Sequence, residues 1–272
     1  MRGTWIKGRM AIVLVLLGTV TYGRADLLVP MDLSQSDHLK AYGLAYKVLK
    51  AGLNVEWLLN YRGGSFLFAD NEIIQRQARL MGVSYEVVNA AQVAIIHAEI
   101  EQENMEVVLL EKAPRVAIYT PPNKSPWDDA VTLALTYAEV DYDKIWDAEV
   151  LDGRLDQYDW LHLHHEDFTG QYNKFYIGYT GRDWYMDEVQ RSEEMAGRFG
   201  FAKVWQLKHA VARRIAEYVR GGGFLFAMCL ASETLDIALS ALDLDIVPAE
   251  VDGDGQDADV QNKLDFNNTL AF

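Results

Sequence analysis

The chain contains a single cysteine, Cys229, which stands between an apolar run and a predicted helix start in the segment GGGFLFAMCLASETLD, residues 221–236. An apolar strand, a nucleophile and then small residues that open a helix form the layout of a nucleophile elbow. Such a turn exposes the nucleophile and directs backbone N–H groups at a developing oxyanion. The residues at two positions on either side, Ala227 and Ala231, are small, although the usual elbow has glycine there. The alternative is that Cys229 is a small apolar residue of the core.

A cysteine nucleophile needs a histidine base that a carboxylate orients. No histidine follows residue 209, so the base must come from upstream of the cysteine. The segment WLHLHHED, residues 160–167, offers His164 or His165 as the base and Glu166 as the orienting carboxylate. These three residues and Cys229 are the candidate catalytic residues, with backbone N–H groups near Leu230 as oxyanion donors.

The same segment admits a metal site. His162 and His164 alternate with leucines, so a strand here would direct both imidazoles to one face. Two histidines at this spacing can share a metal ion with Glu166 or Asp167 as a third ligand. They can equally bind a ligand through hydrogen bonds, or be satisfied by the polar and aromatic insert at residues 170–183. We predict no metal ligands and no cofactor.

Five polar stretches follow predicted strands, and they cover residues 32–38, 60–65, 120–127, 162–167 and 229–233. Ligands of open parallel sheets bind beyond the carboxyl ends of the strands, although loops are polar in any protein. Together the stretches predict a ligand-binding edge. Its candidate ligand-binding residues are Asp32, His38, Asn60, Arg62, Gly63, Gly64 and Glu233.

Two weaker motifs give no site of their own. The pair Gly63-Gly64 belongs to no G-x-G-x-x-G or G-K-[ST] pattern, so nucleotide binding is not predicted and the pair is interpreted as a turn. The acidic segment DGDGQDAD, residues 252–259, lacks the spacing and the closing glutamate of an EF-hand. We interpret it as a solvated acidic loop.

The elements that must position these residues alternate between strands and helices. Strands are predicted at residues 26–32, 54–59, 106–110, 115–119, 144–146, 160–164 and 224–228. Helices are predicted at residues 34–52, 70–81, 86–103, from residue 128, 185–199, 202–220 and 232–242. This alternation predicts an α/β fold with a mostly parallel, doubly wound, flavodoxin-like sheet and an N-terminal βαβ-type region.

The first 25 residues have the composition of a secretory signal peptide. Basic residues precede an apolar run at residues 10–20 that is too short to span a bilayer, and small residues stand at the −3 and −1 positions of a cleavage site after Ala25. Cleavage there moves the formal net charge from −15 to −19, which argues against nucleic acid or an anionic membrane as partner. One cysteine cannot form an internal disulfide. We predict an exported protein, periplasmic or associated with the cell envelope, without a membrane span after cleavage.

Two segments carry a resemblance to a known superfamily. YDWLHLHH at residues 158–165 and YVRGGGFLFAMC at residues 218–229 resemble the class I glutamine amidotransferase-like superfamily, in which a strand reached through Tyr-Asp is followed by a helix ending in glycines, a short apolar strand and a cysteine elbow. The resemblance implies an amidotransferase-like fold over residues 115–242 and a nucleophilic role for Cys229. Active members pair that cysteine with a downstream His-x-Glu motif, which has no counterpart between Cys229 and Phe272.

A closer resemblance runs through LLVPMD at residues 27–32, HLKAYG at 38–43, WLLNYRGGSF at 57–66 and SETLD at 232–236. These segments are similar to exported bacterial proteins labelled asparagine synthetase B. The synthetase itself would need an N-terminal cysteine nucleophile and an S-G-G-x-D motif, and the chain has neither.

The sequence thus predicts four parts: a signal peptide (1–25), an N-terminal α/β region (26–113), an amidotransferase-like α/β domain (114–242) and an acidic tail (243–272) that could begin a further C-terminal part. The leading prediction is an exported protein that binds a small molecule or peptide at the carboxyl ends of its strands. One alternative is a cysteine-dependent amidase or hydrolase that uses Cys229. The other is a noncatalytic subunit with a protein partner in a cell-envelope assembly.

Overall fold

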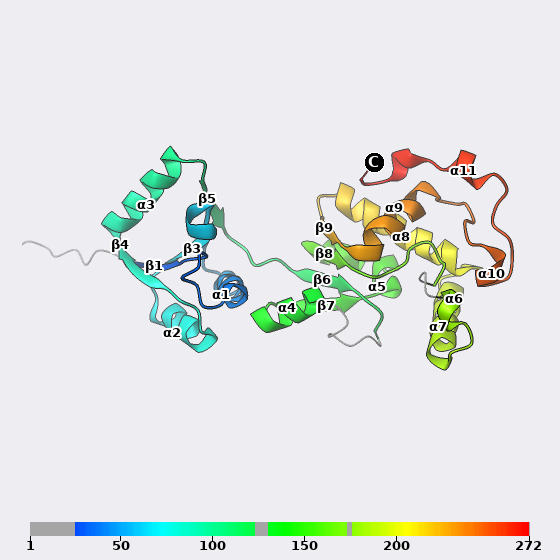
Figure 1. Cartoon of the computed structure of the whole chain (residues 1–272), viewed down its shortest axis with the longest axis horizontal. Coiled ribbons are helices and arrows are strands. Elements are labelled where there is room, and N and C mark those ends of the chain that lie inside the picture. Colours follow the sequence, from blue (N-terminus) through cyan, green and yellow to red (C-terminus); the bar gives the residue numbers. More distant parts are fainter. Residues whose placement is uncertain (1–24, 123–129, 173–175, 272) are drawn as a thin grey trace, which may run out of the picture.

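The computed structural model describes residues 25–122, 130–172 and 176–271, which form two lobes with one β-sheet each (Figure 1). All of the predicted signal peptide except Ala25 lies outside the described residues. Within the described ranges, no helix combines the length and the apolar character needed to cross a membrane. The fold is α/β, as predicted.

The N-terminal lobe is built on a five-stranded sheet with the order β4-β1-β3-β2-β5, in which every neighbouring pair is antiparallel. Its strands are β1 (Ala25–Val29), β2 (Val55–Leu59), β3 (Ser65–Ala69), β4 (Glu86–Asn89) and β5 (Glu106–Leu110). Its helices are α1 (His38–Lys50), α2 (Glu72–Met81) and α3 (Ala90–Gln102), with a single 3₁₀ turn, η1 (Tyr61–Gly63), between β2 and β3.

The prediction of an N-terminal βαβ-type region is wrong, because β3 inserts between the strands that α1 connects. β1 and β2 are each antiparallel to β3 and therefore parallel to each other, but they are not neighbours. The tight turn at residues 60–64 folds the chain straight back onto β2, so β3 occupies the place that a βαβ unit would give to the next parallel strand. Alternation of strands and helices along a sequence does not distinguish these two arrangements.

Helices cover both faces of this sheet. Leu27, Val29 and Phe68 pack with α1 and α2 on one face, and Leu28 and Leu67 pack with α3 on the other. Successive residues of a strand point to opposite faces, so both faces of β1 and β3 are apolar. That accounts for the continuous apolar run of β3, which the sequence analysis assigns to no element.

The C-terminal lobe contains a four-stranded parallel sheet with the order β7-β6-β8-β9. Its strands are β6 (Val116–Tyr119), β7 (Tyr142–Ile145), β8 (Trp160–Leu163) and β9 (Phe224–Ala227). Its longer helices are α4 (Ala130–Ala138), α7 (Asp183–Arg198), α8 (Val204–Arg220) and α9 (Cys229–Ser240). Its short helices are α5 (Asp147–Leu151), α6 (Tyr176–Tyr179), α10 (Ala249–Asp252) and α11 (Val260–Lys263). Two 3₁₀ turns are η3 (Arg154–Gln157) and η4 (Phe266–Asn268). The prediction of a parallel sheet therefore holds for this lobe.

One face of the parallel sheet carries the main core of the lobe. Ala117, Tyr119, Leu161 and Leu163 are almost completely buried and pack against side chains of α5, α8 and α9. This packing fixes the carboxyl ends of β6, β8 and β9 relative to one another, which is the edge where the sequence places its candidate catalytic residues.

The two lobes contact each other through α1 and α4. Gly43 of α1 lies directly against the backbone carbonyl of Ala138, where a Cβ atom would have no room. Lys40 and Lys47 of α1 form ion pairs with Glu139 beside this contact. Because residue 43 has no side chain, α1 and α4 can approach each other closely, and ion pairs on the surface lie beside this contact.

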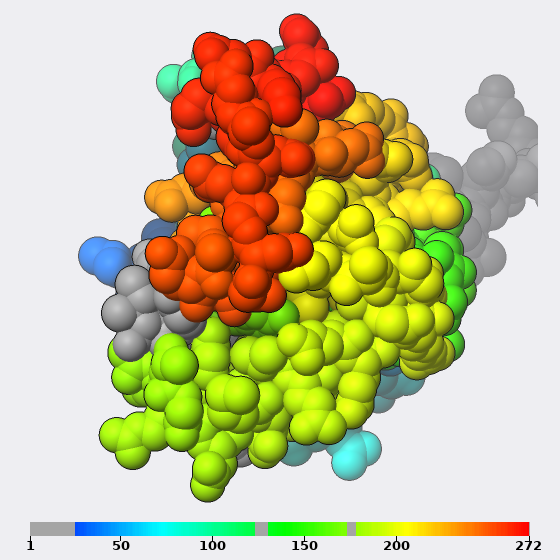
Figure 2. Space-filling model, turned by 90° about the vertical axis from the view of Figure 1, so that its right-hand side faces the viewer, coloured from blue at the N-terminus to red at the C-terminus, as the bar shows by residue number. Residues whose placement is uncertain are grey.

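The acidic tail packs on the C-terminal lobe. Figure 2 shows the red and orange segment running across the surface beside α8, which is yellow. Asp265 donates its backbone N–H to Ser240 O (2.9 Å), and the Asp236 carboxylate accepts from the N–H groups of Leu270 (2.8 Å) and Ala271 (3.1 Å). The tail is therefore held to the end and side of α9.

Candidate functional site

Cys229 occupies a sharp turn between β9 and α9. Met228 still donates to Leu163 O (3.0 Å), so pairing with β8 continues to the residue just before the cysteine. Helix α9 then begins at Cys229 itself, three residues earlier than predicted. Cys229 has φ +52°, a left-handed backbone conformation that costs a residue with a side chain about 1–2 kcal/mol. Such strained residues concentrate at functional sites, where the surrounding structure holds them.

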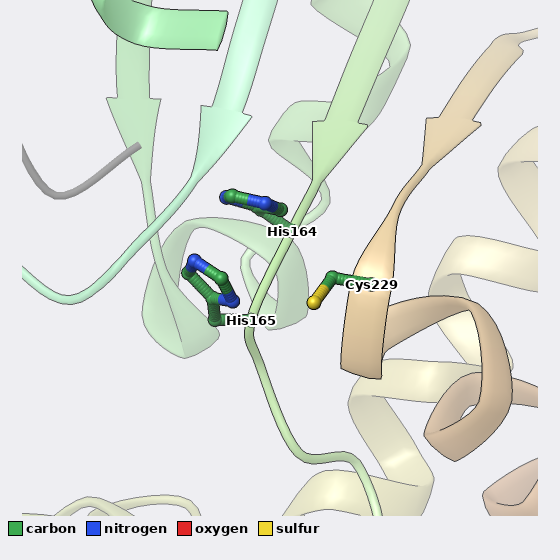
Figure 3. Close-up of side chains that lie close together, drawn as sticks. All are labelled: His164, His165 and Cys229. Carbon is green, nitrogen blue, oxygen red and sulfur yellow. The ribbon is translucent and has the colours of Figure 1, made fainter. Parts of the chain in front are cut away.

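The thiol is exposed and lies beside two imidazoles. The ligand atoms of Cys229, His164 and His165 are all within 4.8 Å of one another. In Figure 3 the sulfur of Cys229 points from the β9–α9 junction toward the segment that leaves β8 and carries both histidines. The two imidazole rings are 3.5 Å apart between centroids. The structure therefore brings together the side chains of Cys229, His164 and His165.

The segment after β8 is tied to α9 by hydrogen bonds to its backbone carbonyls. Ala231 donates its N–H to His164 O (3.1 Å), and the hydroxyl of Thr234 donates to Glu166 O (2.9 Å). The Glu166 carboxylate accepts from the backbone N–H of His164 (2.8 Å). The fourth candidate catalytic residue thus holds the backbone of the histidine segment, and the first turns of α9 hold the same segment from the other side.

Two further contacts fix the continuation of this segment. Asp167 Oδ1 accepts from both the N–H (2.7 Å) and the hydroxyl (2.5 Å) of Thr169. Phe168 is fully buried and stacks on Tyr119 with 5.3 Å between ring centroids. The loop that carries the histidines is therefore anchored at both ends.

A buried ion pair lies close to this edge of the sheet. Lys208 of α8 donates to both carboxylate oxygens of Asp147 (2.9 and 2.8 Å) and lies 3.1 Å from the Tyr119 hydroxyl. The hydroxyl of Tyr119 in turn donates to Asp147 Oδ1 (2.5 Å). Burial raises the pKa of Tyr119 well above its ordinary value, and the charges of Asp147 and Glu166 raise this pKa further. The Glu166 carboxylate is thus electrostatically linked to the buried network.

This network is not among the sites predicted from the sequence. Asp147 comes two residues after β7, so the carboxyl-end criterion could have found it, whereas Lys208 lies inside an amphipathic helix and gives no signal. Asp147 is the first residue of α5, and only the packing of α8 against α5 brings the lysine to the carboxylate.

His162 stays apart from the thiol. It is fully buried, its Nδ1 lies 3.1 Å from Phe226 O, and its ring stacks on Phe226 at 5.7 Å. Its ring centroid is 6.0 Å from that of His164, so the two imidazoles share a face as the alternation predicts. Two groups in the described residues could hold a metal ion. The one that contains histidines combines His164 with His165 and Cys229, and includes neither His162 nor Asp167.

The N-terminal candidate ligand-binding residues form a second cluster in the other lobe. Arg62 Nε donates to Asp32 Oδ2 (2.7 Å), and its terminal nitrogens donate to Glu86 (2.9 Å) and Ser34 (3.2 Å). The hydrogen bond from Arg62 is the main reason why the pKa of Asp32 lies far below its ordinary value. His38 Nε2 is 3.1 Å from Met31 O. The charges of this cluster are therefore paired with one another.

The turn that carries Arg62 is shaped by its backbone. Asn60 and Arg62 have φ of +63° and +45°, and Gly63 and Gly64 have φ of +84° and +94°. A Cβ atom on Gly63 would lie 2.5 Å from Met31 O, so this turn packs tightly on the end of β1. The Asn60 amide donates to Asn104 O (3.1 Å), and Gly64 O accepts from the Trp57 indole (3.1 Å). These contacts fix the turn against the end of β1 and against neighbouring residues of the sheet.

The remaining candidates are more isolated. Glu233 is exposed on α9, one turn beyond the elbow. In the acidic segment, Lys203 Nζ lies 2.6 Å from the Asp254 carboxylate and 3.5 Å from that of Asp252, and these two carboxylates gather with Asp245. A lysine thus offsets the charge of that group.

The elbow cluster can do two kinds of chemistry: nucleophilic attack by the thiol with an imidazole as base, or coordination of a metal ion by sulfur and nitrogen. Comparisons of the chain with protein-family models, with curated proteins and with solved structures gave no match.

Proposed function

We propose that this chain is a cysteine-dependent acyl-transfer enzyme, an amidase or related hydrolase that acts on a small amide or peptide. The observation that carries the proposal is the conformation of Cys229: an exposed thiol on a left-handed residue at a strand-to-helix turn, with two imidazoles within 4.8 Å. A cysteine that only filled the core would need neither exposure nor strain.

The proposed reaction has two steps. An imidazole of His164 or His165 takes the thiol proton, and the sulfur attacks the substrate carbonyl carbon while the backbone N–H of Leu230 stabilises the oxyanion. The imidazolium then protonates the leaving amine as the C–N bond breaks, which leaves a thioester on Cys229. Water, deprotonated by the same imidazole, hydrolyses the thioester and restores the thiol.

The arrangement of strands supports this location for the substrate. The order β7-β6-β8-β9 is the order 2-1-3-4 of a doubly wound, flavodoxin-like sheet, in which ligands bind at the carboxyl ends where the strand order reverses. Here that point lies between β6 and β8, and the histidine segment begins at the end of β8. We propose the same location for the substrate as the amidotransferase-like resemblance implies. We also propose, from residues 1–25, that the enzyme acts after export.

The proposal is tested by trapping the thioester. The chain is incubated with p-nitrophenyl acetate and with γ-glutamyl p-nitroanilide in the presence of a chelator, and the intact mass and the release of chromophore are followed. We expect a burst of chromophore and one acyl group on Cys229. Cys229→Ser should abolish both signals.

The control variant is His97→Gln, which removes a half-exposed histidine paired with Glu56 in the other lobe and should leave the burst unchanged. Acylation at other residues, or a burst that survives in Cys229→Ser, would contradict the proposal.

A further inference from the structure

The three side chains at the elbow also form a set of metal ligands. We propose that Cys229, His164 and His165 bind a borderline-soft divalent cation, with Zn²⁺ as the best match, and that the bound ion silences the nucleophile reversibly. This inference rests on the proposed function for its effect on activity, but the binding of the ion does not depend on it.

The chemistry of the donors selects the class of ion. One sulfur and two imidazole nitrogens are the ligands that Zn²⁺ prefers, whereas Mg²⁺ and Ca²⁺ take oxygen ligands. Three protein ligands leave a fourth tetrahedral position open for water or for an incoming ligand. A site of this kind binds the ion without a fourth side chain.

The geometry is close to that of a zinc site. With Zn–S of about 2.3 Å and Zn–N of about 2.0–2.1 Å, tetrahedral ligand atoms lie about 3.3–3.6 Å apart. The ligand atoms of the three residues lie within 4.8 Å of one another, so the distances between them need to shorten by at most about 1.5 Å. Rotation about side-chain torsions supplies this, because His165 and Cys229 are exposed.

The backbone around the ligands is already fixed. The hydrogen bond from Ala231 to His164 O joins the two segments that supply the ligands, and the bond from Thr234 to Glu166 O adds a second link. Since the elbow and the histidine segment are held together without an ion, binding needs little ordering of the chain.

Binding and nucleophilic attack compete for the same sulfur. Coordination replaces the proton of Cys229 with the metal and releases that proton to the solvent. The sulfur then donates to the ion the lone pair that would attack a carbonyl, so alkylation and acylation of Cys229 stop until a chelator removes the metal.

The test measures binding without any substrate. Metal-free full-length chain is titrated with Zn²⁺ by calorimetry in two buffers of different ionisation enthalpy, and with Co²⁺ by absorption spectroscopy. We expect one ion per chain, proton release, and a sulfur-to-cobalt charge-transfer band in the near ultraviolet. Cys229→Ser should abolish the band, and His164→Gln and His165→Gln should each weaken Zn²⁺ binding by at least about tenfold.

Two controls guard the assignment. His97→Gln and Asp252→Asn, the latter in the acidic group beside Lys203, should leave binding unchanged. Circular dichroism spectra and melting curves without metal show whether each variant folds. Zn²⁺ binding that persists in Cys229→Ser, or is lost in Asp252→Asn, would overturn the proposal, as would no binding by the folded wild-type chain.

The two proposals fail separately. If the chelated chain forms the thioester but binds no Zn²⁺, the metal site is wrong and the enzyme proposal stands. If Zn²⁺ binds with the expected ligands while the chelated chain shows no acylation, the metal site stands and the enzyme proposal is wrong.

Discussion

Two polar clusters at strand ends, one in each lobe, differ in what their side chains are bonded to. Both contain non-glycine residues with positive φ, Arg62 in the turn after β2 and Cys229 in the turn after β9. In the N-terminal cluster, Arg62 bonds to Asp32, Glu86 and Ser34. In the C-terminal cluster, the anchoring bonds go to backbone atoms of the histidine segment and the thiol is exposed.

The difference shows why a strand-end position and a strained backbone do not identify a site on their own. The strained turn at Arg62 connects β2 to β3, and it places the Arg62 side chain where it pairs with Asp32 and Glu86 beyond the end of β1. At the elbow, hydrogen bonds to the backbone of the histidine segment and a nearby buried ion pair hold the structure, and the side chains of Cys229 and His165 are exposed. Each of the following substitutions or pH changes should affect one cluster and not the other.

The largest difference is expected in acyl transfer. Cys229→Ser should lower the rate of acylation by at least about 10³-fold, because the hydroxyl is a far weaker nucleophile without a site built to activate it. Arg62→Gln should leave this rate unchanged. A comparable loss of acylation in both variants, measured by burst kinetics on folded protein, would mean that the clusters are not functionally distinct.

The buried ion pair should dominate the stability of the C-terminal lobe. Asp147→Asn leaves Lys208 buried without its counter-charge, so we expect a loss of about 3–5 kcal/mol in the free energy of unfolding. Urea denaturation measures it. Asp32→Asn breaks an ion pair whose partners are both partly exposed, and should cost much less. Equal losses would contradict the assignment of structural support to the buried pair.

Acid should affect the stability of the C-terminal lobe first. Burial lowers the pKa of His209 from 6.5 to about 4. The charge of Arg213 also lowers this pKa, whereas the charge of Asp243 raises it. The unfolded chain therefore binds the proton more readily, and stability falls as pH drops from about 6.5 to about 4, by roughly 3 kcal/mol in total. His209→Gln should flatten this part of the pH profile.

The N-terminal cluster responds at lower pH. The pKa of Asp32 is depressed in the folded chain, so its contribution is present above the ordinary carboxyl value of 3.8 and is lost only as pH falls below it. Asp32→Asn should change the stability profile in that window and leave the interval from pH 6.5 to 4 as it is in the wild type.

The smallest contrast is steric. In Gly63→Ala the new methyl group would lie 2.5 Å from Met31 O, whereas in Gly52→Ala nothing lies within 4 Å. Both positions have positive φ, so each substitution costs about 1–2 kcal/mol for the backbone alone. In urea denaturation, Gly63→Ala should lower the free energy of unfolding more than Gly52→Ala does. Equal losses would mean that the turn does not pack closely against Met31.

Much of the C-terminal lobe could be predicted from the sequence. The glycines after α8, the apolar strand β9 and the small residues after Cys229 place the elbow, because each element has a local signal. The histidines were found for the same reason, since they follow a strand of clear alternation. The sequence predicts that Glu166 orients an imidazole, and in the structure its carboxylate accepts a hydrogen bond from the backbone N–H of His164.

The N-terminal sheet could not be predicted in the same way. β3 is a short apolar run directly after a turn, and β4 continues without a break into α3, so neither strand has a boundary signal of its own. The direction of pairing depends on the turn at residues 60–64, in which two non-glycine residues, Asn60 and Arg62, have left-handed backbone. The network of Tyr119, Asp147 and Lys208 joins three distant segments and is visible only in the packed structure.

We propose that Cys229 is a nucleophile rather than a core residue. The most direct measurement is the rate of its alkylation by iodoacetamide near neutral pH with a chelator present, for the folded chain, for the chain in urea, and for folded His164→Gln and His165→Gln. The account predicts that the folded chain reacts at least about tenfold faster than the unfolded one and that removal of an imidazole slows it. Slower labelling of the folded chain, or a rate that neither histidine affects, would contradict it.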